Sequence, residues 1–113
     1  MSGEFTALGV ATFLLNAVAA TGQDSTYQIK FGKKVIHACV TGTGAVAAVV
    51  DIYGTCYAGS TDIRKAVKLG TVSPNGTNVG VDSIAFDAPW PWIFANCTSI
   101  SGTDATLDVM LGG

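Results

Sequence analysis

The main pattern along this chain is an alternation of apolar and polar positions with a period of two. It is clearest in residues 104–111, where one parity carries Ala105, Leu107, Val109 and Leu111. Residues 27–31 repeat it, with apolar side chains at Tyr27, Ile29 and Phe31. Because successive side chains of a β-strand point to opposite faces, both segments are predicted to be half-buried strands.

Two further segments, residues 35–40 and 46–53, are apolar at both parities. This pattern is typical of a strand that is covered on both sides, either by a second sheet or by a partner subunit. Other strands are predicted over residues 65–73, 78–86 and 91–100. A slip in parity at Asp82 and Ser83 indicates a β-bulge in the second of these.

Short clusters of Gly, Asn, Ser and Thr separate the apolar segments, for example at residues 42–44 and 101–103. No segment has a convincing helical period, and the Thr, Val and Phe content of residues 5–20 favours one or two extended pieces. We therefore predict an all-β fold, a β-sandwich or jelly roll of about seven or eight short antiparallel strands. Residues 25–113 would form the single domain, with residues 1–24 as an apolar arm or its first strands.

The chain also contains a faint internal similarity. The segment TGTGA at residues 41–45 resembles SGTDA at residues 101–105, and an alternating strand follows each. Two equivalent hairpins, one in each half of the chain, would suit two packed sheets. Chance similarity between two hairpin turns explains the pattern equally well.

Composition narrows the classes of function. Charged residues make up 12% of the chain, against about 25% in a typical soluble domain. A surface so poor in charge favours a subunit of an assembly over a freely diffusing catalyst. The net charge of −2 argues against direct nucleic-acid binding. The basic residues gather at 30–34 and 64–68, either as solvated faces or as docking contacts for a charged neighbour.

Candidate chemistry is sparse. The sole histidine, His37, shares a strand face with Cys39, but residues i and i+2 of a strand lie about 7 Å apart, beyond hydrogen-bond reach. We expect a structural histidine, buried or at a sheet edge. The three cysteines have no zinc-binding spacing and indicate reduced, mostly buried thiols in a cytoplasmic chain, with one disulfide and a leftover thiol as the alternative. No catalytic residue, cofactor or metal is predicted, and the chain is not expected to be an enzyme.

Residues 5–20 imitate the apolar part of a signal peptide. The preceding residues 1–4 are acidic rather than basic, and Asn16 interrupts the apolar run. The run is also too short to cross a bilayer. We therefore interpret it as structural, with no membrane contact.

Both tryptophans lie in the segment Pro89-Trp90-Pro91-Trp92. Each proline favours extended geometry, so the two rings are predicted to point to the same side. Such a pair could close one end of a hydrophobic core, contact a partner protein, or form a carbohydrate platform with Asp87 and Asn96 nearby.

Three stretches carry a family resemblance over residues 12–113: LLNAVAATGQDSTYQI, VTGTGAVAAVVDIYG and DAPWPWIFANCTSISGTDATLDVMLGG. They look like the jelly-roll capsid decoration, or cement, proteins of tailed bacteriophages. The resemblance implies a non-enzymatic virion protein, made in the bacterial cytoplasm, that sits on the capsid exterior and bridges major capsid subunits. The basic cluster at residues 64–68 and the three cysteines depart from the family pattern.

Together these observations predict a decoration protein that associates with itself as a dimer or trimer. Its expected contact residues are Phe5, Leu8, Phe13, Trp90 and Trp92. The alternatives are a carbohydrate-binding or receptor-binding β-sandwich that uses the two tryptophans, and a tail or head-completion component.

Overall fold

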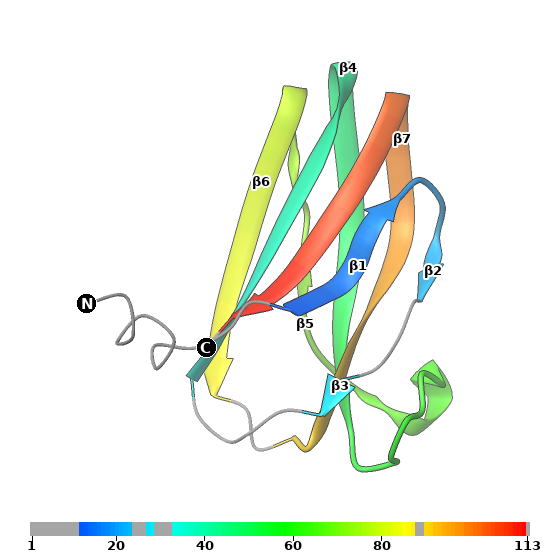
Figure 1. The fold of residues 1–113 in the computed structure, drawn as a ribbon, viewed down its shortest axis with the longest axis vertical. Coiled ribbons are helices and arrows are strands. Elements are labelled where there is room, and N and C mark those ends of the chain that lie inside the picture. Colours follow the sequence, from blue (N-terminus) through cyan, green and yellow to red (C-terminus); the bar gives the residue numbers. More distant parts are fainter. Residues whose placement is uncertain (1–11, 24–26, 29–32, 88–89, 113) are drawn as a thin grey trace, which may run out of the picture.

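The computed structural model describes residues 12–23, 27–28, 33–87 and 90–112, and these are almost entirely β-strand (Figure 1). In chain order the elements are β1 (Thr12–Val18), β2 (Gly22–Gln23), β3 (Tyr27–Gln28), β4 (Lys33–Thr55), the 3-10 helix η1 (Ile63–Lys65), β5 (Val67–Val72), β6 (Asn75–Asp87) and β7 (Trp92–Gly112). Every strand pair is antiparallel. The all-β, antiparallel prediction is confirmed.

Two long strands organise the molecule. β4 has 23 residues and β7 has 21, and they pair along their whole length, from Val35 opposite Gly112 to Thr55 opposite Trp92. Figure 1 shows both strands rising to one end of the molecule and then descending. Each long strand therefore supplies two arms, where the sequence predicts separate short strands joined by turns.

The paired arms make two layers of one folded sheet. In the first layer, residues 33–42 of β4 lie between β6 and residues 104–112 of β7, with β1 beyond β7. In the second layer, residues 45–55 of β4 lie between β5 and residues 92–101 of β7, with β2 and β3 beyond β7. The described residues of the N-terminal segment 1–24 thus belong to the sheet.

The two similar segments, 41–45 and 101–105, lie side by side at the fold, where Thr43 pairs with Thr103. They are bends in two paired strands rather than two equivalent hairpins. Gly44 and Gly102 adopt φ of 75° and 122° there, a region that favours glycine. At Gly42 a Cβ atom would lie 2.7 Å from the carbonyl oxygen of Thr103, so close approach of the two bends also requires glycine.

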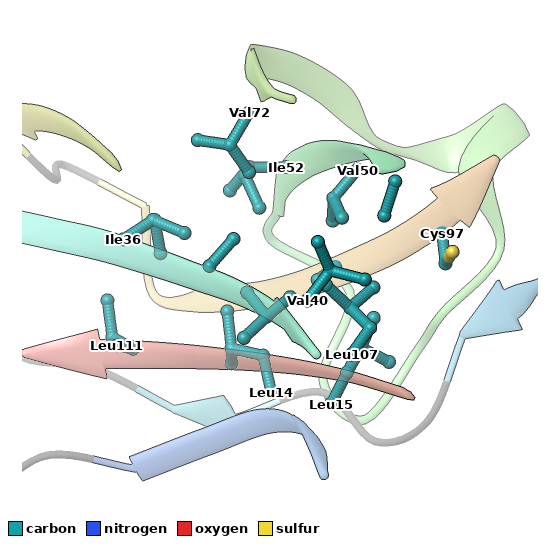
Figure 2. Close-up of a cluster of buried hydrophobic side chains, with 14 of the residues drawn as sticks. Leu14, Leu15, Ile36, Val40, Val50, Ile52, Val72, Cys97, Leu107 and Leu111 are labelled. Atoms are coloured by element: carbon teal, nitrogen blue, oxygen red, sulfur yellow. The ribbon is translucent and has the colours of Figure 1, made fainter. Parts of the chain in front are cut away.

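The core lies between the layers and follows one parity on each long strand (Figure 2). On β4 the buried side chains are Ile36, Ala38, Val40, Val46, Ala48, Val50 and Ile52. On β7 they include Ile93, Ala95, Cys97, Ala105, Leu107, Val109 and Leu111. Because the parity is the same on both arms of each strand, folding the sheet closes one continuous apolar face on itself. Burial of this face supplies the main favourable term in folding.

The structure corrects three expectations about individual strands. Residues 35–40 are covered on one side only, because Val35 and His37 remain exposed. His37 is therefore neither buried nor on an edge strand, since β4 is central in its layer. At Asp82 and Ser83 there is no bulge, because β6 keeps a continuous register with β4 from Val79 to Asp87.

Asp82 has a structural role at this point in β6. Its two carboxylate oxygens accept hydrogen bonds from the backbone N–H groups of Ser73 and Ser83, each at 2.8 Å. These bonds hold the pKa of the Asp82 carboxyl below its ordinary value. The side chain thereby joins β6 to the residue that follows β5.

Candidate functional site: an uncovered sheet face and an ordered loop

The outer side of the first layer is uncovered by the described residues, and we call it the open face. Cross-strand register assigns its positions: Cys39 is opposite Val81 and Asp108, and His37 is opposite Ser83 and Met110. With their neighbours of the same parity, the open face comprises Lys33, Val35, His37, Cys39 and Thr41 of β4, Val79, Val81, Ser83, Ala85 and Asp87 of β6, Thr106, Asp108 and Met110 of β7, and Phe13 of β1.

Exposed apolar side chains gather on the open face. Among the described residues, four of the seven large hydrophobic side chains that stay exposed belong to it: Val81 at 61%, Val79 at 52%, Val35 at 40% and Phe13 at 38%. Single exposed hydrophobic residues are ordinary, whereas several on one face mark a surface that other molecules contact. The open face is thus a candidate interface.

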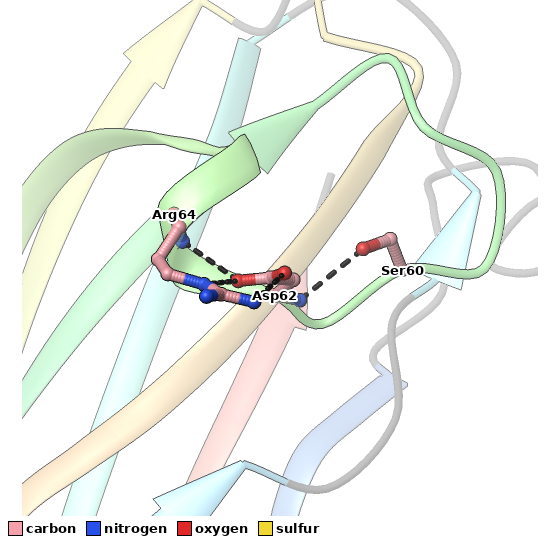
Figure 3. Close-up of polar contacts among 3 residues, drawn as sticks. All are labelled: Ser60, Asp62 and Arg64. Atoms are coloured by element: carbon pink, nitrogen blue, oxygen red, sulfur yellow. Dashed lines mark hydrogen bonds and ion pairs between the residues drawn. The ribbon is translucent and has the colours of Figure 1, made fainter.

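The second candidate surface is the loop of residues 56–66 that connects β4 to β5 (Figure 3). Asp62 caps η1 by accepting a hydrogen bond from the backbone N–H of Arg64 at 2.9 Å. The Arg64 guanidinium donates two more bonds to the Asp62 carboxylate, both at 3.1 Å. These hydrogen bonds hold the pKa of Asp62 below its ordinary value.

Further hydrogen bonds order the base of this loop. The buried Thr55 hydroxyl donates to the carbonyl oxygen of Lys65 and accepts from the backbone N–H of Tyr57, both at 3.1 Å. The Ser60 hydroxyl accepts from the N–H of Asp62 (Figure 3). The loop is therefore a defined structure in the unbound protein rather than a flexible connection.

On this ordered loop, Tyr57, Ile63, Arg64 and Lys65 are exposed, and we call these four residues the loop surface. Tyr57 is 58% exposed, and the Lys65 ammonium lies 5.4 Å from the centroid of its ring. Tyr and Arg are among the residue types that contribute most to binding energy at protein interfaces. The loop surface thus has the composition of a protein contact.

Trp90 and Trp92 do not form the one-sided pair that the proline spacing predicts. The Trp90 ring lies on Gly54, where a Cβ atom would be 2.5 Å from Trp90 Cγ. Gly54 has the same parity as the core residue Ile52. Trp92 is opposite Thr55 in the register and therefore belongs to the other face of the sheet. Both tryptophans are half-buried.

The remaining predicted contact residues divide into two groups. Phe13 lies on the open face, opposite Met110 of β7. Phe5 and Leu8 lie outside the described residues. Val79 and Val81 were not predicted as contact residues, although the change of parity at Asp82 and Ser83 pointed to them. Because β6 has no bulge there, the change of parity means that β6 carries apolar side chains on both of its faces.

The described residues contain little that resembles a catalytic centre. They hold no group of three or more His, Cys, Asp or Glu side chains that could bind a metal ion. A shallow hollow of about 230 Å³ is lined by Lys33, Ala85, Phe86 and Asp87. The Cys97 thiol is buried, which raises its pKa, and it donates to the carbonyl oxygen of Ser99. A buried thiol with a raised pKa is a poor nucleophile.

No protein-family model, curated protein or solved structure matches this chain significantly. Within the described part of the chain, no helix is long and apolar enough to cross a membrane. The function must therefore be inferred from the two surfaces themselves.

Proposed function

We propose that this protein is a structural subunit that acts by binding other proteins, and that it decorates the outside of a tailed-phage capsid. There it bridges neighbouring major capsid subunits. The observation that supports the proposal best is the loop surface, where exposed Tyr57, Ile63 and Arg64 stand on an internally hydrogen-bonded loop. A contact that is already ordered loses little conformational entropy on binding.

The charge pattern fits a large protein lattice as the partner. Arg64 and Lys65 give the loop surface a basic character that the Asp62 carboxylate only partly offsets. A capsid surface that presents carboxylates would complement it. Because capsid subunits repeat by symmetry, a modest contact at each site gains avidity from its neighbours, and no deep pocket is needed.

The thiols suit synthesis in a reducing bacterial cytoplasm. Cys39, Cys56 and Cys97 are all free, and disulfides are rare in proteins that fold in that compartment. Their absence from any bridge agrees with a virion protein that is assembled inside the host cell.

The proposal is tested by cosedimentation with heads of the phage that encodes the chain, prepared without this protein. Wild-type protein is expected to bind saturably, and Tyr57→Ala is expected to weaken binding at least tenfold, because removal of a hot-spot side chain costs about 2 kcal/mol or more. Lys65→Ala should weaken it less. Lys34→Ala removes a cation outside both the loop surface and the open face and serves as the charge-matched control. Wild-type protein that never sediments with heads would refute the proposal.

Two other functions are separated by simple measurements. The alternative of a carbohydrate-binding module uses Trp90 and Trp92 as one platform, but one ring packs on Gly54 and the other residue belongs to the opposite face. Glycan binding that is lost in Trp92→Ala with the fold intact would favour it. A tail or head-completion component would be present in few copies per virion, whereas a decoration protein is present in many, so quantitative mass spectrometry of virions distinguishes them.

A further inference from the structure

The described residues leave the open face uncovered, although the sequence of β4 predicts a strand that is covered on both sides. Residues 35–40 are apolar at both parities, which is typical of a strand buried on both sides. The described structure buries one side of this arm, at Ile36, Ala38 and Val40, and leaves Val35 exposed on the other. The same is true of β6, where Ile84 packs against the core and Val81 does not.

The charges of the open face identify the kind of surface that fits it. Lys33 and Asp87 are cross-strand neighbours of opposite sign at one end of the face. Asp108 is the remaining charged residue, and its carboxylate accepts a hydrogen bond from the backbone N–H of Ala17 at 2.7 Å. With His37 counted as neutral, one lysine and two aspartates give the open face a net charge of −1, and the Asp108 carboxylate is already bound to a backbone N–H. A strongly charged partner would find little complement here, whereas a second open face presents the same mainly apolar side chains.

We propose that the open face binds the open face of a second copy of this chain, forming a twofold dimer with stacked sheets. The inference deepens the proposed function by naming the partner in self-association, and it is tested without capsids. Two sheets that pack face to face lie about 10 Å apart with their strands within about 30° of each other. Val35, Val79 and Val81 of each copy would then interdigitate.

The size of the open face is adequate for a reversible dimer. Four strands at about 4.8 Å spacing and nine residues at about 3.4 Å per residue give roughly 600 Å² as a flat area, and the side chains that project from the sheet add to the accessible surface. A standard interface buries about 800 Å² of accessible surface on each partner. The dimer should therefore form in a concentration-dependent equilibrium and be reinforced wherever copies are held close together.

Sedimentation equilibrium of the purified, reduced protein tests the inference. At high concentration the mass is expected to approach twice the 11.5 kDa of one chain. Val81→Asp should raise the dissociation constant at least 100-fold, because each copy would then add a second carboxylate to the contact, across Cys39 from Asp108. Val67→Asp is the matched control: Val67 is 51% exposed on β5, away from the open face, and this variant should dimerise like the wild type.

Three outcomes overturn the dimer. The first is a wild-type mass of 11.5 kDa at all concentrations, and the second is equal dimerisation of Val81→Asp and wild type. The third is a monomer whose Val81→Asp variant loses head binding, which assigns the open face to the capsid and leaves the proposed function intact. Both valines are exposed, so circular dichroism should show that each variant folds, and Val79→Asp provides a second substitution on the same face.

Discussion

The two outer faces of this folded sheet come from the same long strands, β4 and β7, yet they differ in how many side-chain contacts cover them. On the second layer, Asp51 forms an ion pair with Lys68 at 3.3 Å and accepts a hydrogen bond from Thr71 at 2.8 Å. Phe94 on the same face is fully buried and stacks on Tyr53 with ring centroids 5.3 Å apart. We call this the closed face.

The open face of the first layer has no comparable set of side-chain contacts among the described residues. A hydroxyl pair between Thr41 and Thr106 at 3.1 Å lies near its end, while Val79 and Val81 remain exposed. Cross-strand pairs are the elements that stabilise a sheet face. Among the described residues, the side chains of the closed face therefore contact one another, whereas those of the open face are available to the second copy proposed above.

The largest difference between the faces should appear when an aromatic ring is removed. Phe94→Ala on the closed face is expected to lower the free energy of unfolding by about 3–5 kcal/mol, because a buried ring leaves a cavity. Phe13→Ala on the open face should cost less than half as much, since Phe13 is 38% exposed. Urea denaturation of dilute protein measures both. Equal losses would mean that the faces do not differ in this way.

The next largest difference in stability is expected when one carboxylate is removed from each face. Asp51→Ala removes the contacts with both Lys68 and Thr71 and should cost about 1–2 kcal/mol, because the pair is only partly shielded from water. Asp108→Ala removes one hydrogen bond, from the N–H of Ala17, and should cost about 1 kcal/mol or less. Thermal denaturation of the two variants compares them, and a greater loss from Asp108→Ala would contradict the account.

The dependence of the free energy of unfolding on pH should show that the Asp82 carboxylate stabilises β6, which lies at the edge of the first layer. Its pKa is lowered in the folded protein from an ordinary value of 3.8, so the unfolded chain binds the proton more tightly. Its contribution to stability is therefore present above that value and is lost as the pH falls through the lower, folded pKa. Asp82→Asn should make unfolding less dependent on pH between about 5 and 2. An unchanged pH profile in the variant would exclude this role.

The smallest effect on the monomer is expected on the open face. Val81→Thr should change the stability of dilute protein by about 0.5 kcal/mol or less, because the side chain is 61% exposed. At high concentration the wild type should melt at a higher temperature than when dilute, and the variant should lose much of that increase. A melting temperature of the wild type that is independent of concentration would argue against burial of this face.

The sequence predicts the strands well because alternation is a local property. Residues 104–111 and 27–28 are strand as expected, and the turn signals at 42–44 and 101–103 mark real changes of direction. Alternation does not say whether an apolar face is covered, however. It therefore could not foresee that His37 and Val35 are exposed, or that the turns lie within continuous strands.

The candidate site was harder to predict because it depends on contacts between distant residues. The order of the loop depends on the Thr55 hydroxyl reaching the carbonyl of Lys65, and the position of Trp90 depends on its contact with Gly54. Neither contact can be predicted from the residues that neighbour it in the sequence. Tyr57 and Ile63 lie in a segment that the sequence describes only as a turn region between strands.

The three cysteines provide the most direct test, because one lies in the core, one on the open face and one in the loop. Pulsed alkylation of the native protein, followed by mass spectrometry, measures the reactivity of each thiol. Cys97 should react slowest, since burial raises its pKa, and the exposed Cys56 should react rapidly at every protein concentration. Cys39 is expected to become less reactive as the protein concentration rises, because a second copy would cover it, while the reactivity of Cys56 should stay constant. A Cys39 reactivity that is independent of concentration would contradict the claim that a second copy covers the open face.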